Sequence, residues 1–305
     1  MAGDRPAAAF GSALVTGGTG FLGGHLVRRL AALGVSVTAT VRAGSDPERV
    51  TAISDHATVH RLTGDSGDLV ECVRHARPDV IFHLAARFAS THVHDDISGM
   101  IADNVTFTAE LCEAAVAVET PTLIAAGTAW QNAESPRGDP TPAPNTLYAA
   151  SKQAADDIID YYSARAGLNA VTLKIYDSYG PADSRRKFLA VLRDAAASGE
   201  TLDATPGDQT LHMVHADDLC DGFIHAANLC AVGTIQGRAN HTLPSAEAVT
   251  LRALADAWMK ANGQTADINW GARPHRGGEV MTPWEGKTLP GWSPRIKLAD
   301  GLKGC

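Results

Sequence analysis

The chain has 305 residues, of which 45% are hydrophobic and 20% are charged. This composition excludes an intrinsically disordered chain, and the length suffices for one large domain or two moderate ones. The net charge of −8 argues against nucleic acid or an anionic membrane as the main partner. Because no run approaches roughly 18 apolar residues and no apolar leader is seen, we expect a cytoplasmic protein without a membrane span. The five scattered cysteines should be reduced.

Residues 12–175 alternate between strand-like and helix-like segments. Short apolar or β-branched runs are separated by segments in which apolar side chains recur with helical spacing. This alternation predicts an α/β fold, a Rossmann-type doubly wound parallel sheet with helices on both faces. The strands are expected at 12–16, 35–41, 58–62, 80–83, 122–125 and 170–175, and the helices at 22–33, 68–76, 97–117 and 146–166.

The pattern becomes irregular after residue 175. Helical spacing recurs in three segments, whereas residues 271–294 are dense in Gly, Pro, Arg and Trp and should form loops. We therefore expect a smaller C-terminal substrate-binding lobe over the sheet. The helices are expected at 187–198, 216–228 and 250–262, the Rossmann domain at 1–175 with 213–240 returning to it, and the lobe at 176–212 and 241–305.

A glycine-rich loop joins the first expected strand to the first expected helix. Gly17, Gly20 and Gly23 follow the spacing Gly-x-x-Gly-x-x-Gly. Without β-carbons the backbone turns tightly and approaches a pyrophosphate, whose charge then sits at the helix N-terminus. The loop predicts dinucleotide binding, with Phe21 and Leu22 in the same site; a glycine turn without a ligand is the plain alternative.

The end of the second expected strand indicates which dinucleotide binds. Arg42 and Ser45 stand there, and the nearest acid, Asp46, comes four residues after Arg42. An acid at the strand end binds a ribose 2′-hydroxyl, whereas an arginine accommodates a 2′-phosphate. The sequence therefore favours NADP(H) over NAD(H). Alternatively, Arg42 stacks on the adenine and either cofactor binds.

Two further strand ends should contact the cofactor. Asp65 and Ser66 follow the third strand, where a carboxylate would accept from the adenine amino group or simply form a turn. His83 ends the fourth strand and is better explained as a packed core histidine than as a proton donor. The other residues assigned to the cofactor are Leu84, Ala85, Ala86 and Tyr176.

Tyr148 and Lys152 lie one helical turn apart in the segment 146–166. A free tyrosine has a pKa of about 10, and we expect the Lys152 charge to lower the pKa of Tyr148. Lys152 should also donate to the nicotinamide ribose, and Thr128 should orient a carbonyl oxygen against Tyr148. The pattern predicts carbonyl reduction with Tyr148 as proton donor. A chance Tyr-x-x-x-Lys on an exposed helix is the alternative.

Together these motifs resemble the extended short-chain dehydrogenase/reductase family, in particular its sugar-nucleotide epimerase/dehydratase group. By that resemblance, Asn104 belongs to the catalytic centre near the nicotinamide, although a structural helix amide is an equally fair interpretation. The resemblance rests on residues 16–23 and 83–86, Asn104, Thr128, Tyr148, Lys152, and the segments 179–181 and 215–218.

The resemblance also narrows the reaction. Dehydratases of the group carry an acidic pair directly after the threonine, whereas Ala129 and Trp130 follow Thr128 here. Dehydration is therefore not expected. The chain is more similar to nucleotide-sugar 4-ketoreductases of the abequose/paratose synthase type, which implies NADPH-dependent reduction of a nucleotide-linked 4-keto-6-deoxyhexose. This similarity rests on segments 127–131, 145–152, 176–181, 185–187 and 289–294.

Basic clusters should hold the diphosphate of such a substrate. Arginine forks suit phosphate oxygens, although each cluster can also be read as a solvated surface patch, and Trp130 as loop support. His92 and His94 are poorly spaced for one ion, so no metal site is predicted. The predicted substrate residues are Arg87, Thr128, Trp130, Gln131, Tyr148, Ser178, Arg185, Lys187, Arg273 and Arg276.

Three other functions stay open from the sequence. The first is a nucleotide-sugar epimerase with tightly bound NAD, and the second is an NADPH-dependent reductase of a non-nucleotide ketone or aldehyde. The third is a dinucleotide sensor, which would have no need of Tyr148 and Lys152 together. The resemblance further implies a homodimer, formed through a four-helix contact of segments 97–117 and 146–166.

Overall fold

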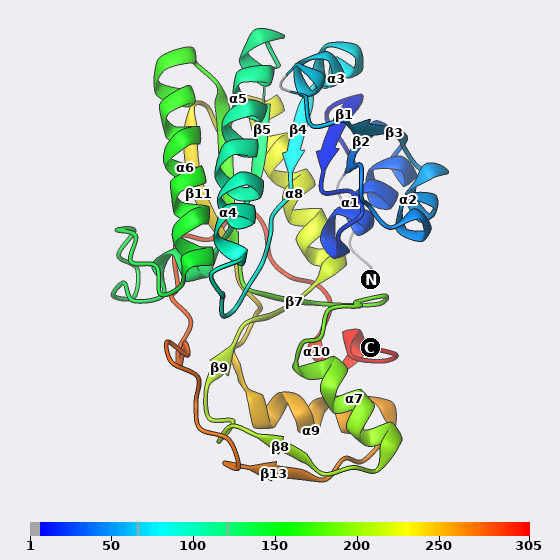
Figure 1. Ribbon diagram of the computed structural model, residues 1–305, viewed down its shortest axis with the longest axis vertical. Coiled ribbons are helices and arrows are strands. Elements are labelled where there is room, and N and C mark those ends of the chain that lie inside the picture. The colour runs from blue at the N-terminus through cyan, green and yellow to red at the C-terminus, as the bar shows by residue number, and fades with distance from the viewer. Residues whose placement is uncertain (1–6, 66, 121) are drawn as a thin grey trace.

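The computed structural model describes residues 7–65, 67–120 and 122–305. Its upper part in Figure 1 contains a seven-stranded sheet in the order β11-β6-β5-β4-β1-β2-β3. Every neighbouring pair in this sheet is parallel. The strands are β1 (Ser12–Thr16), β2 (Ser36–Arg42), β3 (Thr58–Leu62), β4 (Val80–His83), β5 (Thr122–Thr128), β6 (Asn169–Ile175) and β11 (Arg238–Leu243).

Helices cover both faces of the sheet, as the alternating sequence predicts. Apolar residues of the first and eighth helices pack on one face, and those of the third, fifth and sixth pack on the other. The Rossmann-type fold is thereby confirmed. The helices are α1 (Phe21–Ala32), α2 (Pro47–Ser54), α3 (Asp68–Ala76), α4 (Asp96–Ile101), α5 (Phe107–Ala117), α6 (Leu147–Ala166) and α8 (Ala216–Ala231).

The strand order reverses between β1 and β4, because the chain builds outward to β3 and then returns to the other side of β1. The carboxyl ends of β1 and β4 therefore leave a crevice, which is where open α/β sheets bind ligands. The glycine loop follows β1 and the segment 84–86 follows β4. Topology thus brings both predicted cofactor segments to one edge.

Among the sheet strands and the helices that cover them, three elements differ from the expected pattern. The helix expected at 97–117 is interrupted by a π-helical turn, Ala102–Thr106. Helix α2 was not expected because it buries only Ile53, although Asp46 caps its first turn and Pro47 begins it. Strand β11 was not expected because its first residues are polar; it pairs with β6 at the sheet edge.

The lower part is built from the remaining segments. Trp258, Leu254 and Leu192 form its core, and residues 271–294 contain no named helix or strand, as expected from their composition. Within the described ranges, none of the helices combines the length and the apolar character needed to cross a bilayer. The elements are α7 (Phe188–Ser198), α9 (Leu251–Asn262), α10 (Leu298–Gly301), and the short pairs β7 (Asp177–Tyr179) with β10 (Met213–His215), β8 (Leu202–Ala204) with β13 (Ile268–Trp270), and β9 (Thr210–Leu211) with β12 (Val249–Thr250).

Candidate active site

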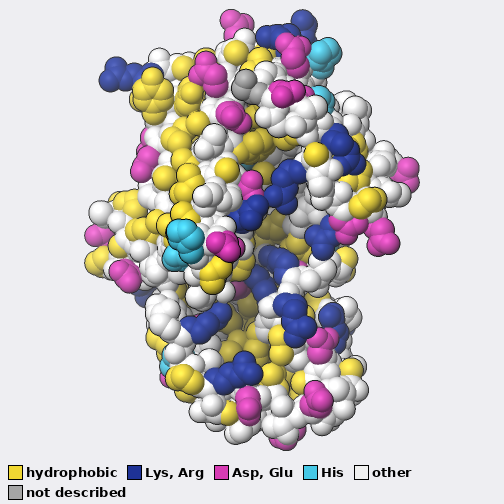
Figure 2. All heavy atoms as spheres, viewed as in Figure 1, with side chains coloured by type: hydrophobic (Ala, Val, Ile, Leu, Met, Phe, Trp, Pro, Cys, Tyr) yellow, Lys and Arg dark blue, Asp and Glu magenta, His cyan; other side chains and the backbone are white. Residues whose placement is uncertain are grey.

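A cleft of about 910 Å³ lies between the carboxyl ends of the strands and the lower part. Figure 2 shows Lys and Arg side chains gathered around this hollow, with hydrophobic side chains inside it. Thr128, Trp130 and Tyr148 line the cleft, and so do Arg273 and Arg276. Residues that the sequence assigns to catalysis and to phosphate binding therefore face one space.

The glycine loop is held in a conformation that only glycine allows. Gly17 has φ +73°, and a β-carbon there would lie 2.7 Å from the backbone nitrogen of Ala85. A β-carbon on Gly23 would lie 2.0 Å from the Gly17 carbonyl oxygen. Gly20 stands directly before α1 as its N-cap, and it offers the N–H groups of the first turn no side-chain acceptor. Such a helix N-terminus suits a pyrophosphate.

His83 is a core histidine, as the sequence analysis favours. Its ring nitrogens lie 2.8 Å from Thr16 Oγ1 and 2.9 Å from Thr108 Oγ1. Burial, and secondarily the charge of Lys152, lowers the pKa of His83 to about 3. The ring is therefore neutral, and it fixes the end of β4 against β1.

Arg42 is exposed at the end of β2, with a partner that the sequence analysis does not identify. Its Nη1 donates to Asp103 Oδ2 at 3.2 Å, and its backbone N–H donates to Ser45 Oγ at 3.0 Å. Arg61, in β3, donates to the carbonyl oxygens of Arg42 at 3.2 Å and Ala43 at 2.9 Å. The guanidinium group of Arg61 therefore lies against the backbone at the end of β2, where a 2′-phosphate is predicted to bind.

The other predicted adenine contact, Asp65, is a turn residue in the structure. Its Oδ2 accepts from Thr63 Oγ1 at 3.2 Å, and its carbonyl oxygen accepts from the N–H of Asp68 at 3.1 Å. Ser66 lies outside the described residues. The contact of Asp65 with adenine stays a prediction.

Asn104 holds the backbone of its surroundings. Its amide oxygen accepts from the Arg87 N–H at 2.7 Å, and its amide nitrogen donates to the Arg87 carbonyl at 3.0 Å and to Ser151 Oγ at 2.9 Å. Both amide protons are thereby used. The side chain is fully buried in the π-helical turn, so the geometry favours the structural helix amide of the two interpretations.

Two residues that the sequence assigns to the substrate do not line the cleft. Gln131 is buried: its oxygen accepts from the Thr128 N–H at 2.8 Å and its nitrogen donates to Gln153 at 2.9 Å, so it caps the turn after β5. Arg87 pairs through Nε with Asp103 at 2.8 Å. Neither residue lines the cleft, whereas Trp130 does.

Tyr148 stands in the first turn of α6 with its ring edges against aromatic neighbours. The ring centroid lies 4.9 Å from that of Phe88 and 6.4 Å from that of Trp130. Burial raises the pKa of Tyr148 to about 12, and the charge that opposes this rise is that of Arg185. The expected lowering by Lys152 is therefore wrong for this structure, because desolvation outweighs the charges around the phenol.

Lys152 is buried one turn beyond Tyr148. Burial lowers the pKa of Lys152 to about 8, against the opposing charge of Asp156. Asp156 is itself held by Thr172, whose hydroxyl donates at 2.6 Å, and by an ion pair with Arg238. A cavity of about 10 Å³ beside Lys152 and Asp156 has room for about one water molecule. The buried carboxylate helps Lys152 to keep its proton.

We expect Lys152→Met to stabilise the fold near neutral pH. Because burial lowers the pKa of Lys152 from 10.5 to about 8, the charged form costs ~3 kcal/mol at pH 7. Between these pKa values the unfolded chain binds more protons than the folded chain, so the cost falls as the pH rises. Urea unfolding should show a gain at pH 7 that shrinks toward pH 10. An equal gain at both values would contradict the burial argument.

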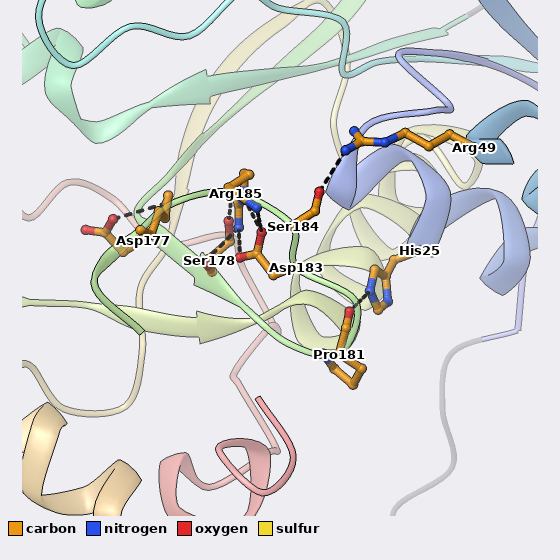
Figure 3. A network of polar contacts seen from close by, with 9 residues as sticks. His25, Arg49, Asp177, Ser178, Pro181, Asp183, Ser184 and Arg185 are labelled. Atoms are coloured by element: carbon orange, nitrogen blue, oxygen red, sulfur yellow. Dashed lines mark hydrogen bonds and ion pairs between the residues drawn. The ribbon is translucent and has the colours of Figure 1, made fainter. Parts of the chain in front are cut away.

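Arg185 is committed to its own loop. Its guanidinium donates twice to Asp183, at 2.7 and 2.6 Å, and to the hydroxyl and carbonyl oxygens of Ser178, at 3.1 and 3.0 Å. Figure 3 shows this cluster. The guanidinium also stacks 4.2 Å above the ring of Phe21, at the start of α1. Four of its five N–H groups are used, so Arg185 ties its loop to the start of α1. Arg185 also lines the cleft, and its contact with a phosphate stays a prediction.

The same loop is tied to the Rossmann helices at two more points. Arg49 of α2 donates to Ser184 Oγ at 2.8 Å, and His25 Nε2 of α1 lies 3.1 Å from the Pro181 carbonyl oxygen. The loop 181–187 therefore closes over the start of α1. The loop therefore contacts the start of α1, where the pyrophosphate is predicted to bind, and also lines the cleft.

The other predicted substrate cations line the cleft with partners of their own. Lys187 lies 3.4 Å from Asp177, and Arg276 donates to Glu279 at 3.0 Å. Arg273 is held through its backbone N–H, which donates to the Ala204 carbonyl at 3.1 Å. The side chains of Arg273, Arg276 and Lys187 stay candidates for the diphosphate.

Tyr176, predicted for the cofactor, lies in the wall of the cleft. Its hydroxyl donates to the Trp284 carbonyl at 2.8 Å, and its ring packs on His212. His212, Phe88 and Arg61 are site residues that the sequence analysis does not identify. Of these three residues, only Arg61 has a signal in the sequence. It lies in the predicted strand 58–62, and the parallel pairing of that strand with β2 places it opposite Val41, near the end of β2.

The comparisons with known proteins show the family of the chain. Residues 13–240 match the NAD dependent epimerase/dehydratase family. The UDP-glucose 4-epimerase of Mycolicibacterium smegmatis is 26% identical over 305 residues, covering 95% of each chain, and the CDP-abequose synthase of Yersinia pseudotuberculosis is 29% identical over 48% of this chain and 50% of its own. MoeE5 in complex with UDP-glucuronic acid and NAD superposes with a TM-score of 0.80 at 25% identity, covering 96% of both chains. The chain therefore belongs to the NAD dependent epimerase/dehydratase family and is an NAD(P)-dependent enzyme of the extended short-chain dehydrogenase/reductase type.

Proposed function

We propose that the enzyme reduces the C4 keto group of a nucleotide-linked 4-keto-6-deoxyhexose with NADPH. One observation carries this proposal: Tyr148 and Thr128 line the same cleft as Arg273 and Arg276. The first pair suits a carbonyl oxygen, and the second pair suits a diphosphate. A cleft of about 910 Å³ is large enough for a nucleotide sugar.

The chain's own residues supply the proton and the positions. The bound nicotinamide supplies a hydride to C4. Thr128 orients the carbonyl oxygen, and the Tyr148 hydroxyl gives that oxygen its proton, so that the ketone becomes an alcohol. Because burial raises the pKa of Tyr148 to about 12, the phenol carries its proton at neutral pH and acts as the acid. Lys152 donates to the nicotinamide ribose, and the charge of Arg185 favours the phenolate that is left.

The relatives support a nucleotide-sugar substrate, and they leave one alternative to the proposed reaction. CDP-abequose synthases are among them, and so is a UDP-glucose 4-epimerase. MoeE5 binds UDP-glucuronic acid and NAD. The alternative function is therefore that of an epimerase with tightly held NAD, which would use the same tyrosine. Ala129 and Trp130 after Thr128 argue against the dehydratase reaction of other relatives.

A substrate panel separates these reactions. Purified enzyme is mixed with NADPH and the 4-keto-6-deoxyglucose derivatives of UDP, dTDP and CDP, and absorbance is followed at the NADPH band. The proposal expects stoichiometric consumption with one of the three. Stoichiometric NAD released on denaturation, with epimerised sugar and no NADPH consumed, would assign the epimerase instead. Activity that survives Arg273→Ala and Arg276→Ala would favour a non-nucleotide ketone or aldehyde.

Arg42→Ala should weaken the preference for NADPH. A charge-assisted contact with the 2′-phosphate contributes roughly 10- to 100-fold in affinity. We expect the Kd for NADPH to rise by about that factor and the Kd for NADH to stay within about threefold, as measured by fluorescence titration. Arg74→Ala is the control, because Arg74 is an exposed side chain on α3. An equal loss for both cofactors would assign Arg42 to adenine stacking.

We also propose that the enzyme forms a homodimer. Ile97 and Ile101 of α4 and Tyr161 of α6 are exposed apolar side chains on the two helical segments implied in the contact. Light scattering tests the dimer, and a strictly monomeric enzyme would contradict it.

A further inference from the structure

His212 has an acceptor nitrogen with no partner in the described part of the chain. Its Nδ1 lies 2.9 Å from Ser245 Oγ, and the Ser245 hydroxyl donates its only proton to the Glu247 carbonyl at 2.6 Å. His212 Nδ1 must therefore carry the proton and donate to Ser245. It follows that Nε2, which is buried and unpaired, is an unprotonated acceptor.

Strand pairing places this histidine beside the reacting end of the cleft. Tyr176 and His212 directly precede the paired strands β7 and β10, and their ring centroids lie 4.8 Å apart. Tyr176 follows Ile175, which is the register partner of Thr128 in the neighbouring strand. His212 lines the cleft together with Thr128 and Tyr176. It therefore belongs to the sugar end of the proposed substrate site.

The acceptor character of Nε2 selects the kind of group that it would bind. A buried acceptor without a partner costs free energy that a ligand donor recovers. A diphosphate at neutral pH offers only acceptors, so it does not satisfy Nε2. Burial lowers the pKa of His212, against the opposing charge of Glu285, which keeps the ring neutral. A neutral hydroxyl is the matching partner, and a hexose carries several.

We infer that His212 accepts a hydrogen bond from the C3 hydroxyl of the bound hexose and so selects sugars that keep this group. The inference rests on the proposed function, which places the C4 oxygen at Thr128 and Tyr148. In a 4-keto-6-deoxyhexose, C5 carries a methyl group, so the hydroxyl next to C4 is the one at C3. His212 thus discriminates against 3-deoxy sugars.

Binding rather than turnover tests this inference. The UDP, dTDP and CDP derivatives of glucose are titrated into the enzyme by calorimetry with saturating NADP, and the tightest is compared with its 3-deoxyglucose counterpart. The wild type should prefer the 3-hydroxy sugar roughly three- to tenfold, the worth of one neutral hydrogen bond. His212→Phe should abolish the preference, and His212→Gln, whose amide oxygen accepts, should keep part of it.

His241→Phe is the matched control. His241 is also a buried histidine with an unpaired ring nitrogen, Nδ1, but it lies in β11 and does not line the cleft. The control should keep the full preference for the 3-hydroxy sugar. A variant effect shared by His212→Phe and His241→Phe would mean a general weakening of packing and would overturn the inference.

The remaining outcomes separate the inference from the function on which it rests. Wild-type binding without discrimination at C3, or an equal loss for both sugars in His212→Phe, overturns the role of His212 alone. If none of the three glucose nucleotides binds the wild type, the nucleotide-sugar function fails, and the inference fails with it.

Discussion

Tyr148→Phe should lower kcat for the reduction of a 4-keto nucleotide sugar by about 10²- to 10⁴-fold, the usual contribution of a positioned general acid. The ring stays between Phe88 and Trp130, so only the proton donor is lost. KM for the sugar and Kd for NADPH should change by less than about threefold, since a hydroxyl that acts in the transition state adds little to ground-state binding. Initial rates of NADPH oxidation measure the effect.

Tyr161→Phe is the control for this variant. Tyr161 stands on the same helix, α6, but its side chain is exposed and does not line the cleft. The control should retain wild-type kcat. If Tyr148→Phe also retained it, the proton would come from another group and the proposed mechanism would fail.

Gly17→Ala should abolish tight cofactor binding. A β-carbon there would lie 2.7 Å from the Ala85 nitrogen and 2.9 Å from the Leu84 carbonyl carbon, both of them backbone atoms that no side-chain rotation moves. The loop must shift away from β4, and the N–H groups at the start of α1 then no longer point at the pyrophosphate. Each charge-assisted hydrogen bond that is broken raises the Kd for NADPH roughly 10- to 100-fold. Fluorescence titration measures the affinity, and circular dichroism checks the fold.

Gly34→Ala separates the clash from simple backbone strain. Gly34 has φ +79°, close to that of Gly17, but a β-carbon there would meet no atom within 4 Å. The control should lose about 1–2 kcal/mol of stability from the left-handed conformation and keep its affinity for NADPH. Equal affinity losses in both glycine variants would show that Gly17 acts through stability only.

The architecture was predictable because it rests on local patterns. Periodic apolar residues predict the sheet strands and their covering helices, and the spacing of Gly17, Gly20 and Gly23 needs no tertiary information. The same holds for Tyr148 and Lys152, since residues four apart on a helix share a face. The sequence also predicts that His83 is packed in the core, because it ends an apolar strand, and the structure confirms that its ring is buried.

The failures concern properties that depend on neighbours distant in sequence. The pKa of Tyr148 rises because Phe88, Trp130 and the wall of the cleft remove water from the phenol, which no spacing rule reveals. The partners of Arg185, Asp183 and Ser178, are near in sequence, but only the folded loop brings them onto its guanidinium group. The role of Gln131 in the turn after β5 has a local signal, because Thr128 and Gln131 form a Thr-x-x-Gln capping box.

The most direct test of the account is the fate of the hydrogen on nicotinamide C4. Enzyme is given NADPH deuterated on each face in turn, together with the nucleotide-linked 4-keto-6-deoxyhexose that it accepts, and the product is analysed by NMR and mass spectrometry. We expect one deuterium at sugar C4, from one face only, for each NADPH oxidised. A product epimerised at C4 that contains no deuterium, with NADPH left unoxidised, would contradict it.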